Sequence, residues 1–537
     1  MQRQSTHFGQ LAIAAMTGLL ALPLVSGCAR AHYHKATFSP VPTPYPMADT
    51  AFEAAYAPEF NTEAYDHLQE IGFKHVTREP LSTFSIDVDT ASYSNVRRFL
   101  NNGSPPPAGA VRIEEMLNYF RYDYAPPADD APFATHMEVA ACPWKPDHLL
   151  ARIGLKGKEF PREQRPPANL VFLVDVSGSM NMPDKLPLVQ RSLRMLVEEM
   201  NEQDRIAIAV YAGASGLALP STTCDNKMQI VAALDELQAG GSTNGGEGIQ
   251  LAYRVAGKNF IQDGINRVIL ATDGDFNVGI TNQSALVDLI EEKREEGIFL
   301  TVLGFGTGNL KDSTMEKLAN KGNGSYAYID SLNEARKVLV EQVSGTLHTI
   351  AKDVKIQVEF NPERIAAYRL LGYENRMLQP EDFNNDKVDA GEIGAGHTVT
   401  AMYELVPAGV ESPAAGVDPL RYQAAADTTP AAGSDELFLL KLRYKAPDDD
   451  TSSLLEFPFA RPVSAYAEAS NDFRFASAVA SFGMLLRNSE YKGDTSYRQV
   501  QAWAEEGLGD DEGGYRKEMI QLVKKSADMQ QKVARAE

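Results

Sequence analysis

The stretch that decides the fold is Leu170-Val-Phe-Leu-Val-Asp-Val-Ser-Gly-Ser179, an apolar run that ends in one carboxylate and two hydroxyls. Residues 170–174 show no polar alternation, which is typical of a strand buried on both faces of a parallel sheet. The loop after such a strand lies at the carboxyl edge of the sheet. Asp175, Ser177 and Ser179 therefore bring hard oxygen ligands to that edge, and these suit Mg²⁺ or Mn²⁺ better than zinc.

Two later segments can deliver further oxygens to the same edge. Gly240-Gly-Ser-Thr243-Asn-Gly-Gly246 is a flexible loop with a hydroxyl in its middle, and Val268-Ile-Leu-Ala-Thr-Asp273-Gly274 is a second buried strand that ends in a carboxylate. With DxSxS, a loop threonine and an aspartate after a later strand, the sequence resembles the von Willebrand factor A (vWA) domain and its metal-ion-dependent adhesion site. Carried over residue by residue, the resemblance implies these metal ligands: Asp175, Ser177, Ser179, Thr243 and Asp273.

DxSxS by itself has another interpretation. It is also found in ordinary strand-to-helix turns, in which Ser179 or Asp184 would cap the helix that follows. The order of Thr243 and Asp273 at the ends of the expected elements favours the metal site.

Length and charge limit the classes of protein. The 537 residues suffice for two to four domains, and the apolar fraction of 44% is ordinary for globular proteins. The net charge of −21 argues against a nucleic-acid partner or direct binding to an anionic membrane, because both would repel an acidic surface.

The N-terminus predicts export. Met1-Gln-Arg3 is followed at 11–24 by an apolar core too short to span a bilayer, as in a secretion signal. The core ends in Val25-Ser-Gly-Cys28, which resembles the bacterial lipobox and implies lipidation of Cys28. The alternative is a plain signal peptide with an incidental cysteine. Ala29 after the cysteine points to an outer-membrane lipoprotein of the cell envelope, facing the periplasm or the cell surface.

Two further cysteines, Cys142 and Cys224, remain in the expected mature chain. In an oxidising compartment they are able to pair or to stay as two separate thiols. The sequence leaves both possibilities open, because it does not give the distance between them.

We expect five segments. Residues 1–27 are the signal peptide, 28–69 the lipidated cysteine with a proline-rich tether, and 70–150 a small mixed α+β domain. Residues 168–347 alternate strand and helix patterns, which predicts a doubly wound, Rossmann-like α/β domain, the vWA domain of the resemblance. Residues 352–537 predict a β-sandwich-like module that ends in helices.

Two weaker motifs are interpreted as structural. Phe84-Ser-Ile-Asp87-Val-Asp89-Thr90 resembles the nucleophile motif of haloacid-dehalogenase-like phosphatases, but a short helix and a proline-rich stretch follow it instead of a large α/β domain. We expect Asp87 and Asp89 to cap a turn. The segment 382–389 begins like a calcium loop, yet it lacks the glycine at the sixth position, and Ile393 stands where the bidentate glutamate should be. We expect a solvated turn there.

The whole arrangement resembles bacterial vWA-domain lipoproteins. The resemblance implies a non-enzymatic, envelope-anchored module for adhesion or complex assembly, which binds a protein presenting an acidic residue to the metal and touches the membrane only through its lipid. An alternative from the same family is a non-catalytic subunit that works with a ring ATPase. A hydrolase is the least favoured reading, because the chain has no HExxH, no GxSxG and no Cys-His pair at a recognisable spacing.

Overall fold

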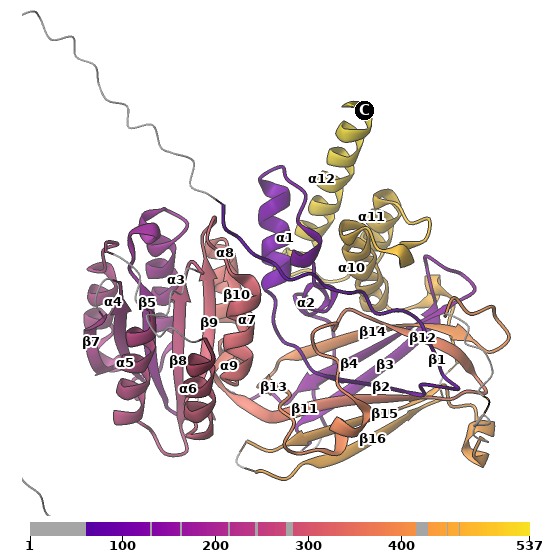
Figure 1. Ribbon diagram of the computed structural model, residues 1–537, viewed down its shortest axis with the longest axis horizontal. Coiled ribbons are helices and arrows are strands. Elements are labelled where there is room, and N and C mark those ends of the chain that lie inside the picture. Colours follow the sequence, from indigo (N-terminus) through magenta and orange to yellow (C-terminus); the bar gives the residue numbers. More distant parts are fainter. Residues whose placement is uncertain are drawn as a thin grey trace, which may run out of the picture. The chain divides into compact units, whose positions relative to one another are not determined.

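The computed structural model describes residues 61–128, 131–161, 164–212, 215–241, 245–274, 283–414, 421, 428–447, 449–460 and 462–536 (Figure 1). Cys28, with the signal and most of the tether, lies outside the described residues, and so does Thr243.

A six-stranded sheet forms the vWA domain. Its order is β10-β9-β8-β5-β6-β7, and all neighbours are parallel except β7, which runs antiparallel to β6. Strand order reverses between β5 and β8, because β6 and β7 extend the sheet on one side of β5 and β8 to β10 extend it on the other. The strands are β5 (Ala168–Asp175), β6 (Arg205–Tyr211), β7 (Ser215–Thr223), β8 (Ile265–Thr272), β9 (Phe299–Phe305) and β10 (Tyr326–Ile329).

Helices cover both faces of this sheet. Phe172 and Val174 of β5 belong to a core with α3, whereas Val171 and Leu173 belong to a second core with α5. This alternation confirms the predicted doubly wound α/β fold. The helices of this part are α3 (Leu186–Glu199), α4 (Lys227–Asp235), α5 (Gly245–Lys258), α6 (Gln283–Glu295), α7 (Asp312–Lys321), α8 (Leu332–Arg336) and α9 (Val343–Leu347).

Two five-stranded sheets enclose a shared apolar core as a β-sandwich. One has the order β1-β12-β14-β4-β3, and the other has the order β13-β11-β15-β16 with β2 also paired to β11. The strands are β1 (Lys74–His75), β2 (Leu81–Ser85), β3 (Phe133–Ala141), β4 (Leu149–Gly157), β11 (Thr349–Phe360), β12 (Ile365–Leu371), β13 (Gly391–Gly394), β14 (Thr398–Pro407), β15 (Phe438–Lys445) and β16 (Ser453–Phe459).

Both sheets mix strands from before and after the vWA domain. Phe84 of β2 lies opposite Ile356 of β11, and Arg152 of β4 lies opposite Met402 of β14. The segments expected as an N-terminal and a C-terminal domain therefore fold together, and in the chain the vWA domain is inserted between β4 and β11.

A helical layer packs on the outer face of the first of these two sheets. Leu150 and Met402 face the helices, whereas their neighbours Ala151 and Tyr403 face the sandwich core. The helices are α1 (Ala91–Asn101), α2 (Ile113–Asn118), α10 (Asn471–Arg487), α11 (Tyr497–Glu506) and α12 (Tyr515–Ala536).

Cys142 and Cys224 are both buried free thiols. Cys142 lies in the helical core and Cys224 in the core of the vWA domain, so the structure has two separate thiols.

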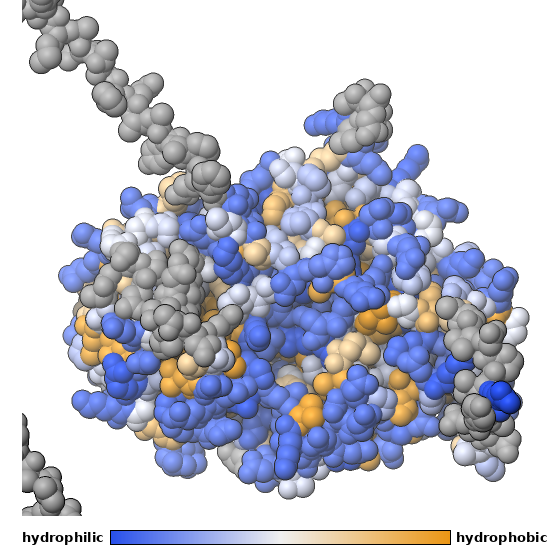
Figure 2. Space-filling model, viewed as in Figure 1, coloured by the Kyte–Doolittle hydropathy of each residue, from blue (hydrophilic) through white to orange (hydrophobic). Residues whose placement is uncertain are grey.

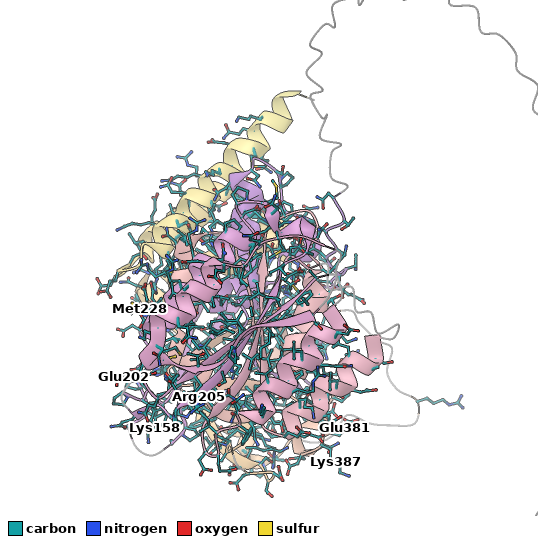
Figure 3. All side chains as sticks on the ribbon, turned by 90° about the vertical axis from the view of Figure 1, so that its left-hand side faces the viewer. Lys158, Glu202, Arg205, Met228, Glu381 and Lys387 are labelled. Carbon is teal, nitrogen blue, oxygen red and sulfur yellow. The ribbon has the colours of Figure 1, made fainter. Side chains whose placement is uncertain are left out.

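Large exposed apolar side chains are few among the described residues. Hydrophilic residues dominate the face in Figure 2. Met228 on α4, labelled in Figure 3, is 89% exposed, and Met182 in the loop after Ser179 is 44% exposed.

No helix in the described part of the chain is long and apolar enough to cross a membrane.

Candidate metal centre

Asp175 and Asp273, two of the predicted ligands, lie where the strand order reverses. Asp175 is the last residue of β5, and Asp273 directly follows β8, the strand beside it. Ligands of open α/β sheets bind at this position, outside the carboxyl ends of the strands.

Asp175 is fully buried and held by three donors. Its Oδ1 accepts the Ser177 N–H at 2.9 Å, and its Oδ2 accepts the hydroxyls of Tyr211 at 3.0 Å and Thr272 at 3.3 Å. Burial raises the pKa of Asp175 to about 6; the negative charge of Asp273 also raises it, while the hydrogen bonds lower it. An ionised carboxylate offers about four acceptor positions, so one remains for a cation.

Ser177 and Ser179 lie on the turn around the short helix η3 (Gly178–Asn181). Their Oγ atoms are 3.1 Å apart. Adjacent oxygens on an octahedral Mg²⁺, at Mg–O distances of about 2.0–2.1 Å, are about 2.9 Å apart. The hydroxyl pair therefore has a spacing that fits two neighbouring ligands of one ion.

The capping interpretation of these residues does not match the geometry. Helix α3 begins at Leu186, and its N-cap position is Lys185, which makes no side-chain cap bond. Neither Ser179 nor Asp184 occupies the cap position.

The loop that carries Thr243 starts beside this turn. The Gly240 N–H donates to the Val176 carbonyl at 2.8 Å, and the Gly178 N–H donates to the Gly241 carbonyl at 3.1 Å. Thr243 itself lies outside the described residues, so its part in the site stays a prediction.

Asp273 has a partner that the sequence did not suggest. Its side chain is fully buried, and its Oδ2 accepts from Lys185 Nζ at 2.9 Å and from Asn309 Nδ2 at 3.2 Å. Tyr211 was detectable in principle, because it ends the strand next to β5. Nothing in the local pattern signalled Lys185 or Asn309.

The donor chemistry fits a hard divalent cation. The side-chain atoms of Asp175, Ser177 and Ser179 that can bind a metal ion are all oxygens. A set of oxygen ligands without nitrogen or sulfur suits Mg²⁺ or Mn²⁺. Asp273 is shared with the Lys185 ammonium.

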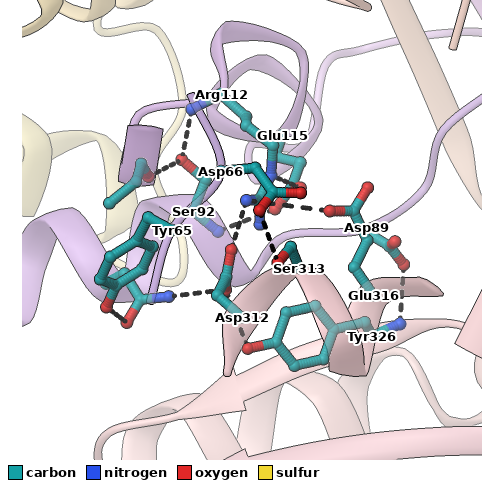
Figure 4. Close-up of polar contacts among 12 residues, drawn as sticks. Tyr65, Asp66, Asp89, Ser92, Arg112, Glu115, Asp312, Ser313, Glu316 and Tyr326 are labelled. Carbon is teal, nitrogen blue, oxygen red and sulfur yellow. Dashed lines mark hydrogen bonds and ion pairs between the residues drawn. The ribbon is translucent and has the colours of Figure 1, made fainter. Parts of the chain in front are cut away.

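A second group of carboxylates comes from the segment after β2, from α2 and from α7, and Figure 4 shows two of its members, Glu115 and Glu316. Oxygens of Asp87, Glu115 and Glu316 lie within 4.8 Å of one another. Arg112 donates to Glu115 and to Asp312 of α7. Glu316 lies 3.8 Å from Arg112 and 3.5 Å from Arg376, so these carboxylates already have cationic partners within the chain.

Asp87 and Asp89 of the phosphatase-like motif lie in this second group of carboxylates and their cationic partners. Arg376 donates to Asp87 at 3.2 Å and to Asp89 at 3.1 Å, and the Tyr326 N–H donates to Asp89 at 2.7 Å. Both carboxylates are buried and bind other groups of the chain, which agrees with the interpretation of this motif as structural.

The calcium-like segment does not form one ligand shell. Asp382 accepts the Gln379 N–H, Asp386 accepts the Ser452 hydroxyl, and Asp389 pairs with Arg294 at 2.8 Å. Asp389 lies near Asp353 and Glu392 instead.

Comparison with known protein families matches three parts of the chain. The von Willebrand factor type A domain family matches residues 169–342, the family described as von Willebrand factor matches 59–152, and the family described as uncharacterized protein YfbK, C-terminal, matches 345–529. The Escherichia coli (strain K12) protein described as uncharacterized protein YfbK is 46% identical over 469 residues, covering 86% of this chain and 80% of that protein. The chain belongs to the YfbK family of vWA-domain proteins.

More distant relatives share only part of their length with the chain. Human inter-alpha-trypsin inhibitor heavy chain H3 is 25% identical over 260 residues, 44% of this chain and 28% of that protein. The Arabidopsis thaliana E3 ubiquitin-protein ligase WAV3 is 27% identical over 269 residues, 48% of this chain and 34% of that protein. A solved von Willebrand factor type A structure from Catenulispora acidiphila is 14% identical and covers 72% of this chain and 89% of that one, with a TM-score of 0.40.

Membership of this family means that the chain contains a vWA domain. vWA domains generally mediate protein–protein interactions, commonly bind a divalent metal at the adhesion site, and are typically non-catalytic.

Proposed function

We propose that the chain is a protein-binding module of the cell envelope whose partner contact depends on Mg²⁺ or Mn²⁺. Asp175, Ser177 and Ser179 would hold the ion, with Thr243 and Asp273 completing the site. The observation that carries the proposal is the serine hydroxyl pair, 3.1 Å apart, beside a fully buried carboxylate at the strand-order reversal.

The charge of the site favours an acidic partner. The serine hydroxyls add no charge, while Asp175 and Asp273 contribute two negative charges and Lys185 one positive charge. A bound divalent cation leaves the site positive and electrophilic. An Asp or Glu side chain of a partner protein is the ligand that this charge attracts most strongly.

The N-terminus supports an envelope location. The signal-like segment and Val25-Ser-Gly-Cys28 favour a lipid anchor at Cys28, with the body held off the membrane by the proline-rich tether. The role is adhesion or complex assembly, without catalysis by this chain.

Capture of envelope proteins on the immobilised protein tests the proposal. Wild type in Mg²⁺ should retain a partner that EDTA releases and that returns when Mg²⁺ is restored. Asp175→Ala should retain none, whereas Asp235→Ala, which removes a half-exposed carboxylate of α4, should behave as wild type. Retention that is equal with and without EDTA would rule out the metal-dependent contact.

A further inference from the structure

The second carboxylate of the candidate metal centre is neutralised by a buried lysine. Lys185 Nζ lies 2.9 Å from Asp273 Oδ2, and the exposed fractions of the two side chains are 1% and 0%. A cation of the chain itself therefore already occupies one side of the carboxylate that the resemblance assigns to the metal.

The backbone around Lys185 fixes this contact. The Lys185 N–H donates to the Met182 carbonyl at 3.0 Å, and the Lys185 carbonyl accepts the N–H groups of Leu188 and Val189 in the first turn of α3. The lysine is thus held between the DxSxS turn and the helix, and its side chain runs back toward the end of β8.

Gly306 provides the space for the lysine side chain. A Cβ at this position would lie 2.3 Å from Lys185 Cγ and 2.6 Å from Cε, and the backbone has φ +71°, a value that favours glycine. Tyr328 donates its hydroxyl to the Gly306 carbonyl at 2.7 Å, which holds this backbone in place.

The ion pair has two opposite consequences. Without Lys185, the buried carboxylates of Asp175 and Asp273 would lose the ammonium that partly neutralises them, at a cost of several kcal/mol. With Lys185, the domain has its compensating charge in the absence of metal. The same ammonium repels a divalent cation and competes with it for Asp273.

We propose that Lys185 is a tethered counter-ion that keeps the vWA domain folded without metal and limits the affinity of the centre for divalent cations. This inference rests on the proposed metal site. It assigns Lys185 a positioning role, since it acts on the metal through Asp273.

Titration of Mg²⁺ into the purified protein by calorimetry, with Mn²⁺ electron paramagnetic resonance as a second readout, tests the proposal. Lys185→Met should bind the ion more tightly, by roughly tenfold, because a positive charge a few ångströms from the ion is removed. Its unfolding temperature without metal should fall, and the rise on adding Mg²⁺ should exceed that of wild type.

Lys258→Met is the matched control. It removes the same charge from the exposed last turn of α5, about 20 Å along that helix from the loop beside the metal centre. It should leave the Mg²⁺ affinity unchanged.

A double variant keeps the test decisive if Lys185→Met alone does not fold. Lys185→Met with Asp273→Asn removes both charges of the pair, so it should recover most of the stability lost in Lys185→Met without metal. No recovery would overturn the ion-pair account.

The outcomes separate this inference from the proposed function. Equal Mg²⁺ affinity in wild type and Lys185→Met overturns the inference and leaves metal-dependent partner capture intact. If Lys185→Met binds Mg²⁺ more tightly while partner capture is the same with and without EDTA, the inference is supported and the proposed function is contradicted. Absence of Mg²⁺ binding in both proteins overturns both.

Discussion

Tyr211 donates its phenolic hydroxyl to Asp175 Oδ2 at 3.0 Å, and both side chains are fully buried. The two residues end neighbouring strands and lie opposite each other in the register of β5 and β6. The first carboxylate of the centre is therefore oriented by the adjacent strand.

Tyr211→Phe should lower the free energy of unfolding by about 1–2 kcal/mol and weaken Mg²⁺ binding several-fold, because a buried acceptor loses its donor and Asp175 loses an orienting contact. Urea unfolding and calorimetry measure the two effects. Tyr253→Phe is the control, since the buried Tyr253 hydroxyl finds no hydrogen-bond partner among the described residues. If both variants lose stability equally, the Tyr211 contact has no specific role.

Arg112→Met should destabilise the protein by about 3–5 kcal/mol, because Arg112 pairs with the buried Glu115 and Asp312 and its loss removes the cation that balances the buried Asp312 carboxylate. Arg194→Met removes a half-exposed pair with Asp235 and should cost less than about 1 kcal/mol. Urea unfolding compares them, and a cost for Arg112→Met as small as that for Arg194→Met would contradict the account.

Stability should fall as the pH rises from about 5 to 8, in part through Glu115. Burial raises the pKa of Glu115 from 4.5 to about 8; Arg112 lowers it, and the charges of Asp87 and Glu316 raise it. The folded state therefore binds the proton more tightly than the unfolded state. The stability from this group is fully present below pH 4.5 and is lost as the pH rises through 8.

Glu115→Gln should flatten this decline by up to about 1.4 kcal/mol per pH unit. Urea unfolding at several pH values measures it, with Glu79→Gln, a change at an exposed side chain, as the control. An unchanged slope in Glu115→Gln would show that this carboxyl does not titrate in the window.

Cys28→Ala should move the protein from the membrane fraction to the soluble envelope fraction, because it removes the acceptor of the proposed lipid. Fractionation and mass spectrometry of the N-terminus measure this. Membrane retention of Cys28→Ala, with no lipid adduct on wild type, would exclude the anchor.

Much of the vWA part was predictable because its signals are local. The apolar run before Asp175, the strand before Asp273 and the alternating strand and helix patterns of residues 168–347 each follow from short-range periodicity. The vWA family and the α/β class are both confirmed.

Other features depend on contacts between distant segments. The pairing of Phe84 with Ile356 joins strands separated by the whole vWA domain, and no local pattern reveals such a partner. The Lys185–Asp273 pair is also invisible to local patterns. The Lys185 side chain fits only because Gly306 has no Cβ, and the folded backbone alone brings these residues together.

The most direct test of the central claim is calorimetric titration of Mg²⁺ into wild type and Asp175→Ala, both shown to be folded by circular dichroism. Wild type should bind one ion per chain saturably, Asp175→Ala should bind none, and Thr243→Ala should lose less affinity because water can replace a neutral oxygen. Identical heats for wild type and Asp175→Ala would contradict the account and place any binding surface elsewhere on the chain.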